Sequence, residues 1–175
     1  MLEGPIQEDV DAGLPADLRI FEAKPSPSGA TYTGRSWRYR MEHPGNAIGD
    51  MIAVDANRFL VIERDNGNGP TARFKAIFLI DRRDHDHDGY VDKELLLNLM
   101  AVPNPGKVNG ITDAFLTFPF VTIEDVEVID DQTIVVLNDN NFPGGGGRTD
   151  GVPDDNELIV VQLDKPLDVD RRLLA

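Results

Sequence analysis

Short apolar runs separated by Asp, Asn, Gly and Pro recur along the chain. The clearest runs lie at 59–62, 74–80, 134–137 and 158–163. Runs of this length, rich in Val, Ile, Leu and Phe and bounded by turn-forming residues, are typical of β-strands. A helical alternative is left open only at Leu95–Met100. The pattern therefore predicts an all-β fold.

An internal repeat organises these runs. Ile48–Asp55 aligns with Ile123–Asp130, and Phe59–Asn66 aligns with Ile134–Asn141, both at an offset of 75 residues and without a gap. Each copy continues into a further strand-like run, at 74–81 and 157–164, and then into another, at 93–99 and, more weakly, at 167–174. Three or four strands recurring at this spacing predict a β-propeller or a similar repeat fold.

A partial third copy stands at the front of the chain. Leu18–Ala23 and Trp37–Met41 align with the second and third strands, and Met1–Gly4 aligns with the ends of the inner strands, so we expect the chain to begin inside a strand. This gives one partial propeller domain over 1–175, with an incomplete blade at 1–45, a blade at 46–102, and a blade with a C-terminal strand at 103–175. About two and a half blades are too few to close a ring. We therefore expect the C-terminal part of a longer protein, or a protomer that self-associates through its open edge.

Composition narrows the range of partners. The 175 residues include 17 Lys and Arg against 31 Asp and Glu, which gives a net charge of −14. Nucleic acid is not an expected partner, because phosphate backbones are bound by clustered Lys and Arg. No apolar run approaches the roughly 20 residues of a membrane helix, and residues 1–11 lack the pattern of a signal peptide. The absence of Cys excludes disulfides and thiolate chemistry.

Polar residues end the inner strands and form the first candidate metal site. Because side chains alternate along a strand, Glu63 and Asp65 should face one way, as should Asn138 and Asn140. In a propeller these ends converge near the central channel, where carboxylate and amide oxygens suit Ca²⁺. The alternative is that Asp and Asn simply terminate strands in Asx turns. The candidate ligands are Glu3, Asp50, Glu63, Asp65, Glu124, Asp125, Asn138 and Asn140.

A second candidate metal site lies in the segment Asp84–Glu94. Five residues match the first, third, fifth, sixth and ninth positions of a calcium-binding loop: Asp84, Asp86, Asp88, Gly89 and Asp92. The twelfth position, a bidentate Glu in an EF-hand, is Leu95, and the preceding run resembles a strand, so we do not expect a true EF-hand. Weak Ca²⁺ binding by a hairpin loop and a solvated acidic turn both stay open.

Basic residues near the strand ends are the candidates for holding an anionic substrate: Arg64, Lys75 and Arg148. Arg148 follows Gly144–Gly147, but this run lacks the Gly-Lys-Ser/Thr ending and the helix of a phosphate-binding loop, so we expect a flexible loop. Serine-hydrolase chemistry has no support, because the chain has no Gly-x-Ser-x-Gly motif and no His in a triad context.

Five segments together resemble a known family: Ile48–Met51, Val61–Gly67, Phe118–Asp125, Leu137–Phe142 and Asp154–Glu157. They resemble the phytase-like domain family of bacterial proteins, named for an esterase-like activity of phytase, and the similarity runs from about Met1 to Asp164. Leu2–Gly4 resembles a motif that lies mid-domain in that family, which agrees with missing N-terminal blades. The resemblance implies a β-propeller that hydrolyses phosphate or other esters. It also implies an extracellular or periplasmic location for the full-length parent.

These observations lead us to expect a metal-dependent, phytase-like ester hydrolase that acts on a small anionic ester. Ca²⁺ held by the strand-end oxygens would bind the phosphate oxygens, and a metal-bound water would attack phosphorus. The expected catalytic residues are Glu63, Asp65, Arg64 and Glu124, with Arg64 stabilising the developing negative charge. The alternatives are a non-catalytic, calcium-stabilised propeller that binds a ligand or a partner, and an inactive fragment.

Overall fold

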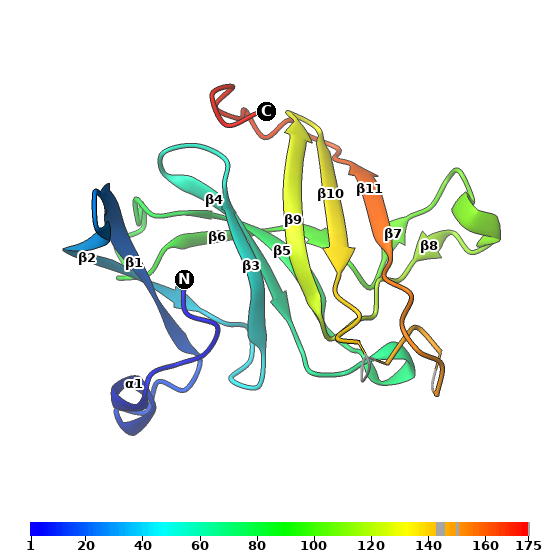
Figure 1. Ribbon diagram of the computed structural model, residues 1–175, viewed down its shortest axis with the longest axis horizontal. Helices are drawn as coiled ribbons and strands as arrows, with labels where there is room; N and C mark the ends of the chain where they lie inside the picture. The colour runs from blue at the N-terminus through cyan, green and yellow to red at the C-terminus, as the bar shows by residue number, and fades with distance from the viewer. Residues whose placement is uncertain (143–145, 150, 175) are drawn as a thin grey trace.

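A computed structural model describes residues 1–142, 146–149 and 151–174 (Figure 1). The described residues are mostly strands joined by turns, so the all-β prediction is confirmed. The elements in chain order are α1 (Gln7–Asp11), β1 (Asp17–Ser26), β2 (Gly29–Arg40), β3 (Ala47–Ala53), β4 (Arg58–Arg64), η1 (Gly69–Thr71), β5 (Lys75–Asp81), β6 (Asp92–Asn98), β7 (Val102–Pro103), η2 (Val108–Gly110), β8 (Phe115–Leu116), β9 (Ile123–Asp130), β10 (Thr133–Asn138) and β11 (Leu158–Gln162).

The central layer is an antiparallel sheet with the strand order β3-β4-β5-β6. Alternate residues of β4 and β5 enter two separate hydrophobic cores, so the middle of this sheet is buried on both faces. Leu60 and Ile62 pack in the core shared with β9–β11, whereas Val61 and Phe78 pack in the core shared with the β1–β2 hairpin. This double burial explains why these strands form nearly continuous apolar runs in the sequence.

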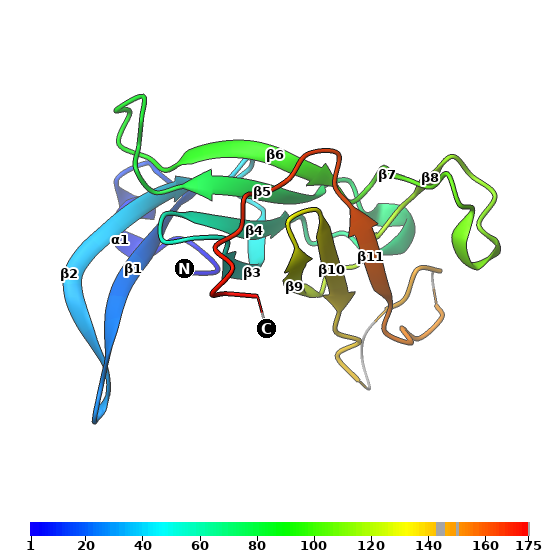
Figure 2. The same cartoon turned by 90° about the horizontal axis from the view of Figure 1, so that it is seen from above.

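A long hairpin of β1 and β2 packs its base on the central sheet and projects away from it (Figure 2). Leu18 and Tyr39 are buried at the base, whereas the outer part of the ribbon is mostly exposed. On this outer part Phe21 and Tyr32 contact each other edge to face, with ring centroids 5.6 Å apart. Two of the strands expected in the first 45 residues, at Leu18–Ala23 and Trp37–Met41, are confirmed, and each is longer than its apolar run.

The second sheet, with the order β11-β10-β9, packs against the central sheet through their shared core. The two sheets meet where β3 lies beside β9. Gly49 permits this approach, because a Cβ at this position would lie 1.9 Å from the carbonyl oxygen of Ile123. The pairing of β3 with β4 is irregular at the same point, and Asp50 Oδ2 accepts a hydrogen bond of 3.0 Å from the backbone N–H of Val126. A backbone irregularity thus joins the two sheets.

The C-terminal segment departs from the expected repeat. The run 167–174 should form a fourth strand beside β11, but no strand forms there. Instead, Leu167 N–H donates to the carbonyl of Asp131 at 2.7 Å, and Asp170 N–H donates to the carbonyl of Val54 at 2.9 Å. Leu167 and Val169 are buried in the core between the two sheets. The prediction of a C-terminal strand is wrong, because this segment crosses back to the central sheet.

Three smaller expectations also change. The short helix α1 was not expected, and in the described chain no helix has the length and apolar character of a membrane span. The helical alternative at Leu95–Met100 is wrong, because β6 continues to Asn98. Met1–Gly4 does not lie in a strand, although the carbonyl of Glu3 accepts a hydrogen bond of 3.3 Å from Ile48 N–H at the start of β3.

The propeller prediction concerns how the sheets are arranged around an axis. In the part of the chain that the structure describes, the strands form four separate antiparallel sheets, including the two-stranded β1–β2 and β7–β8 pairs. A four-stranded meander lies beside a three-stranded one, and their first strands, β3 and β9, are neighbours. Adjacent propeller blades have this arrangement, so the propeller stays a proposal.

Candidate functional site

Charged side chains from four parts of the chain gather where β4 and β10 end and β9 begins. Arg64 is the last residue of β4, two carboxylates lie at the start of β9, and one directly follows β10. Pairing of Ala47 with Arg64 brings the end of β4 to the start of β3, which lies beside β9. We call these residues the strand-end group: Glu3, Arg64, Glu124, Asp125 and Asp139.

The carboxyl group of Glu124 is perturbed by its surroundings in the strand-end group. Its pKa is raised, first because neighbouring atoms displace water and next because the Asp139 carboxylate lies nearby. Glu3 and Asp125 also raise this pKa, whereas the Arg64 guanidinium lowers it. A carboxyl group with a raised pKa beside a guanidinium is suited to proton transfer. The repulsion between these carboxylates is also what a bound cation would relieve.

Arg64 lies partly buried among these carboxylates. Its Nη1 donates a hydrogen bond of 2.7 Å to Asn66 Oδ1, whereas its Nε is buried and has no partner among the described residues. Burial lowers the pKa of Arg64, against the opposing effect of Glu124 and Glu3. Buried donors are nearly always paired. The Nε–H of Arg64 is therefore an unsatisfied donor within the described structure, and it is shielded from solvent.

Glu63, expected among the metal ligands and catalytic residues, lies in the protein interior. Its side chain is fully buried. Its two oxygens accept four hydrogen bonds, from Tyr39 Oη (2.6 Å), Glu42 N–H (2.7 Å), Asn46 Nδ2 (2.7 Å) and Lys93 Nζ (2.8 Å). These contacts join β4 to the β1–β2 hairpin, the 42–46 loop and β6. In this arrangement Glu63 anchors the fold.

Asp65 and Lys75 form a second internal pair, just beyond the end of β4. Lys75 Nζ donates to Asp65 Oδ1 at 2.6 Å and to the carbonyl of Gly67 at 2.7 Å, and the lysine side chain is fully buried. Asp65 Oδ2 accepts the backbone N–H groups of Arg73 and Phe74. Burial alone would raise the pKa of Asp65, but these hydrogen bonds lower it. Lys75 therefore holds the loop that follows β4, and its buried side chain is not accessible to a substrate in solvent.

Three further predicted ligands also bond within the protein. Asp50 bridges β3 and β9, as described above, and Asn140 Oδ1 accepts a backbone N–H of its own turn. Asn138 is fully buried, donates to Asp154 Oδ2 at 2.5 Å, and accepts the backbone N–H of Glu157 at 2.7 Å. Of the eight predicted strand-end ligands, the structure therefore brings three together in the strand-end group: Glu3, Glu124 and Asp125.

Arg148 is held by neighbouring side chains. Its Nε and Nη2 donate to the two carboxylate oxygens of Glu157 at 2.9 and 2.5 Å, and Nη1 donates to the carbonyl of Thr117 at 2.7 Å. Its guanidinium carbon lies 5.5 Å from the ring centre of Phe120. The preceding glycine run, 144–147, falls partly outside the described residues. Arg148 thus fixes the loop before β11 in place.

The acidic loop, residues 84–92, connects β5 with β6. Asp84, Asp86 and Asp88 each place one carboxylate oxygen within 4.8 Å of the others. No other trio of His, Cys, Asp or Glu in the described ranges is arranged in this way. Asp92, the fourth expected ligand, instead accepts hydrogen bonds from the backbone and ring of His85. Three clustered carboxylates have the donor chemistry that Ca²⁺ prefers.

Sequence reasoning missed one member of the strand-end group, Asp139. Strict alternation along the strand made Asn138 and Asn140 the expected pair. The register of β10 with β9 shifts between Leu137 and Asn138, so alternation ends before these residues. The sequence did contain a signal for Asp139, because this residue lies between two Asn residues in a segment that aligns with the end of β4.

A family model matches most of the chain. The model, described as phytase-like, esterase-like activity of phytase, matches residues 1–142. The matched range contains the whole strand-end group and the acidic loop, and it ends before Arg148. No curated protein and no solved structure matches the chain.

Proposed function

Because the chain belongs to the phytase-like family, we propose that it hydrolyses an anionic ester, with a phosphate monoester as the substrate class, at the strand-end group. The observation that supports this choice of site is Glu124, which has a raised pKa and has the Arg64 guanidinium among its charged neighbours. Glu63 and Asp65, expected as catalytic residues, do not take part in the proposed reaction. Their hydrogen bonds give them a positioning role beneath Arg64, which stands between them in the sequence.

The proposed chemistry needs two actions from these residues. Glu124 in its carboxylate form takes a proton from the attacking water, and its raised pKa makes it a stronger base than an ordinary carboxylate. Arg64 donates a guanidinium N–H to a phosphate oxygen, where negative charge develops as the bond from water to phosphorus forms. The bond from phosphorus to the alcohol oxygen breaks, and the proton taken up by Glu124 passes to that leaving oxygen. Both roles depend on the end of β4 lying beside the start of β9.

We propose two positions for Ca²⁺, and of these only the acidic loop already holds three carboxylate oxygens within 4.8 Å of one another among the described residues. At the strand-end group, Glu3, Glu124, Asp125 and Asp139 offer carboxylate oxygens whose mutual repulsion a cation would offset. At the acidic loop, Asp84, Asp86 and Asp88 already lie together. When bound at the strand-end group, Ca²⁺ would supply positive charge for an anionic ester, which a chain of net charge −14 otherwise repels. At the loop its effect would be on stability.

Hydrolysis of a chromogenic phosphate monoester and of a matched carboxyl ester, each with Ca²⁺ and after chelation, tests the proposal. We expect hydrolysis of the phosphate ester with Ca²⁺, and a fall of roughly 10²–10⁴-fold in Glu124→Gln, the usual contribution of a general acid–base group. Glu127→Gln, on the same strand and exposed, is the matched control and should keep full activity. Equal activity in both variants would contradict the assigned site.

The internal bonding of Glu63, Asp65 and Asn138 favours a second candidate, a non-catalytic, calcium-stabilised binding module. In that case Ca²⁺ would raise the melting temperature while neither ester is hydrolysed. Ligand that binds only the folded state adds about 2.7 kcal/mol of stability at a hundredfold excess over its dissociation constant. Asp86→Asn should remove the part of this stabilisation that comes from the acidic loop, without affecting any hydrolysis at the strand-end group.

A further inference from the structure

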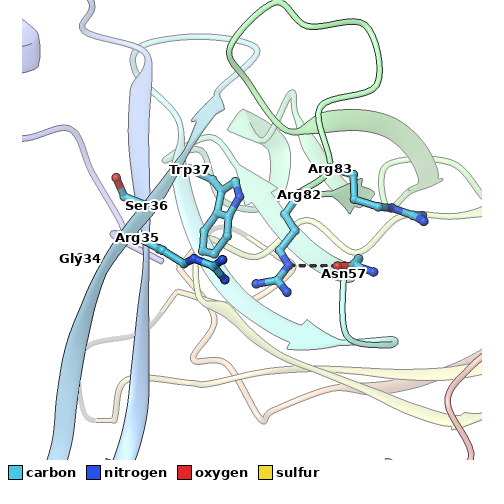
Figure 3. A pocket seen from close by; sticks show the side chains of 7 residues that line it. All are labelled: Gly34, Arg35, Ser36, Trp37, Asn57, Arg82 and Arg83. Atoms are coloured by element: carbon cyan, nitrogen blue, oxygen red, sulfur yellow. Dashed lines mark hydrogen bonds between the residues drawn. The ribbon is translucent and has the colours of Figure 1, made fainter.

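A cationic hollow lies between β2, the β3–β4 turn and the residues that follow β5. Figure 3 shows its lining. The hollow measures about 520 Å³, and the residues around it are Gly34, Arg35, Ser36, Trp37, Asn57, Arg82 and Arg83. Three of these seven residues are arginines and none is acidic, in a chain where acidic residues outnumber basic ones by 31 to 17. The lining of the hollow is therefore positively charged, whereas the molecule as a whole is negatively charged.

Arg82 is held in position at the centre of the hollow. Its Nε donates to Asn57 Oδ1 at 3.2 Å, and its guanidinium carbon lies 4.8 Å from the ring centre of Trp37. Its Nη1 donates to Glu22 Oε1 at 3.3 Å. The remaining nitrogen, Nη2, has no hydrogen bond to the described residues. A guanidinium fixed on three sides is preorganised to donate this free edge to a ligand.

Arg35 brings a second positive charge to the same place. Its Nη1 lies 3.8 Å from Glu22 Oε1, the oxygen that also accepts from Arg82. The other oxygen of Glu22 accepts from Thr33 Oγ1 at 2.8 Å, so one carboxylate faces two guanidinium groups. One positive charge is therefore left without a counter-charge. In Figure 3 Arg35 and Arg82 extend along the two sides of Trp37, whereas Arg83 is directed away, in keeping with its pairing with Asp81.

We propose that this hollow is an anion-binding site that takes a phosphate group on Arg35 and Arg82. The planar donor edges of two guanidinium groups match the oxygens of phosphate, and charge-assisted hydrogen bonds of this kind are the strong ones. Trp37 forms the wall between them and shields one side from water. The site does not depend on the proposed ester hydrolysis. Asn57 precedes β4 and Arg64 ends it, so the two sites lie about 20 Å apart along a seven-residue strand.

Trp37 makes a direct test feasible, because it is the single tryptophan of the chain. Its fluorescence is titrated with inorganic phosphate at constant ionic strength, and a parallel titration uses a phosphate monoester. Comparing the two dissociation constants shows whether the site prefers the free ion or an esterified phosphate. We expect a saturable change at millimolar concentration or below. Arg35→Gln and Arg82→Gln should each weaken binding by about tenfold or more, the effect of losing one charged hydrogen-bond donor.

Two further variants sharpen the test. Glu22→Gln removes the carboxylate that competes with the ligand for both arginines and should tighten phosphate binding. Arg172→Gln removes an exposed arginine near the C-terminus and should leave the titration unchanged. Arg82 contacts Trp37, so its variant can alter the fluorescence or the fold. Arg35, whose side chain is 69% exposed, keeps the test valid in that case. A non-saturating signal, an equal response to chloride, or an unchanged midpoint in Arg35→Gln would overturn the proposal.

Discussion

Glu124 and its charged neighbours set the pH range in which the strand-end group can act. If Glu124 works as a base, activity falls as the pH drops through its raised pKa. Asp139→Asn removes a negative neighbour, so the pKa of Glu124 falls and the acidic limb of the pH–rate profile moves to lower pH. Arg64→Gln removes a positive neighbour and moves the limb to higher pH. A pH–rate profile of each variant checks this, and shifts in the same direction would contradict it.

Glu63 offers a second test at the residue scale. In Glu63→Gln one carboxylate oxygen becomes an NH₂ group, which cannot accept from the Tyr39 or Lys93 donors that it meets. We expect a loss of about 1–3 kcal/mol in the free energy of unfolding, the cost of an unsatisfied buried polar group. Urea denaturation measures it, with Glu94→Gln, on exposed β6 surface, as the matched control. Unchanged stability combined with lost hydrolysis would instead restore Glu63 as a catalytic residue.

At the scale of elements, the contact between β3 and β9 depends on Gly49. Alanine there would place its Cβ 1.9 Å from the carbonyl oxygen of Ile123, so one sheet must move. We expect Gly49→Ala to lower the free energy of unfolding by about 1–3 kcal/mol or more, as overpacking does. Gly4→Ala is the control, because no atom lies within 4 Å of its added Cβ. Equal denaturation midpoints for the two variants would mean that the contact between β3 and β9 is not tightly packed.

The strands were predictable wherever burial alone decides the structure. The run Phe59–Ile62 is apolar because both of its faces meet a core, and in Ile134–Leu137 the residues Ile134 and Val136 face the core between the sheets, so composition indicates β4 and β10 directly. The segment 167–174 is only half apolar, and hydrogen bonds to distant turns hold it outside any sheet. Helix α1 is also held by tertiary contacts, since its buried Asp9 pairs with Arg19 of β1 at 2.8 Å. No local sequence pattern indicates these tertiary contacts of the segment 167–174 and of α1.

The functional residues were less predictable than the strands, for a related reason. The sequence correctly indicates that polar side chains collect at strand ends, but not which of them bond internally. Glu63 and Glu124 are both strand-end glutamates; one is enclosed by four donors and the other is exposed among carboxylates. The pairing of β9 with β10 passes from Asp125 to Ile123 and leaves out Glu124, a register shift that strict alternation along the strand does not predict.

At the scale of the whole molecule, β11 is an exposed edge. In the described chain it pairs only with β10, and Leu158 and Val160 are 57% and 64% exposed on it. An apolar edge strand of this kind pairs readily with another chain. We expect concentration-dependent self-association, which Val160→Lys should reduce and Ser28→Lys, at the exposed hairpin tip, should not. Sedimentation at several protein concentrations checks this, and a wild-type monomer throughout would exclude the edge as a contact.

The core between the two sheets also has a consequence for synthesis on the ribosome. Ile77 of the central sheet belongs to the same hydrophobic core as Leu167, which emerges 90 residues later. At typical elongation rates this interval lasts roughly 5–20 s. Once β6 has also emerged, the nascent chain exposes an apolar face of the four-stranded meander until the residues that complete this core follow. Chaperone demand for this protein should therefore be set by translation speed between β6 and the last ten residues, and codons that slow this stretch should lower the soluble yield.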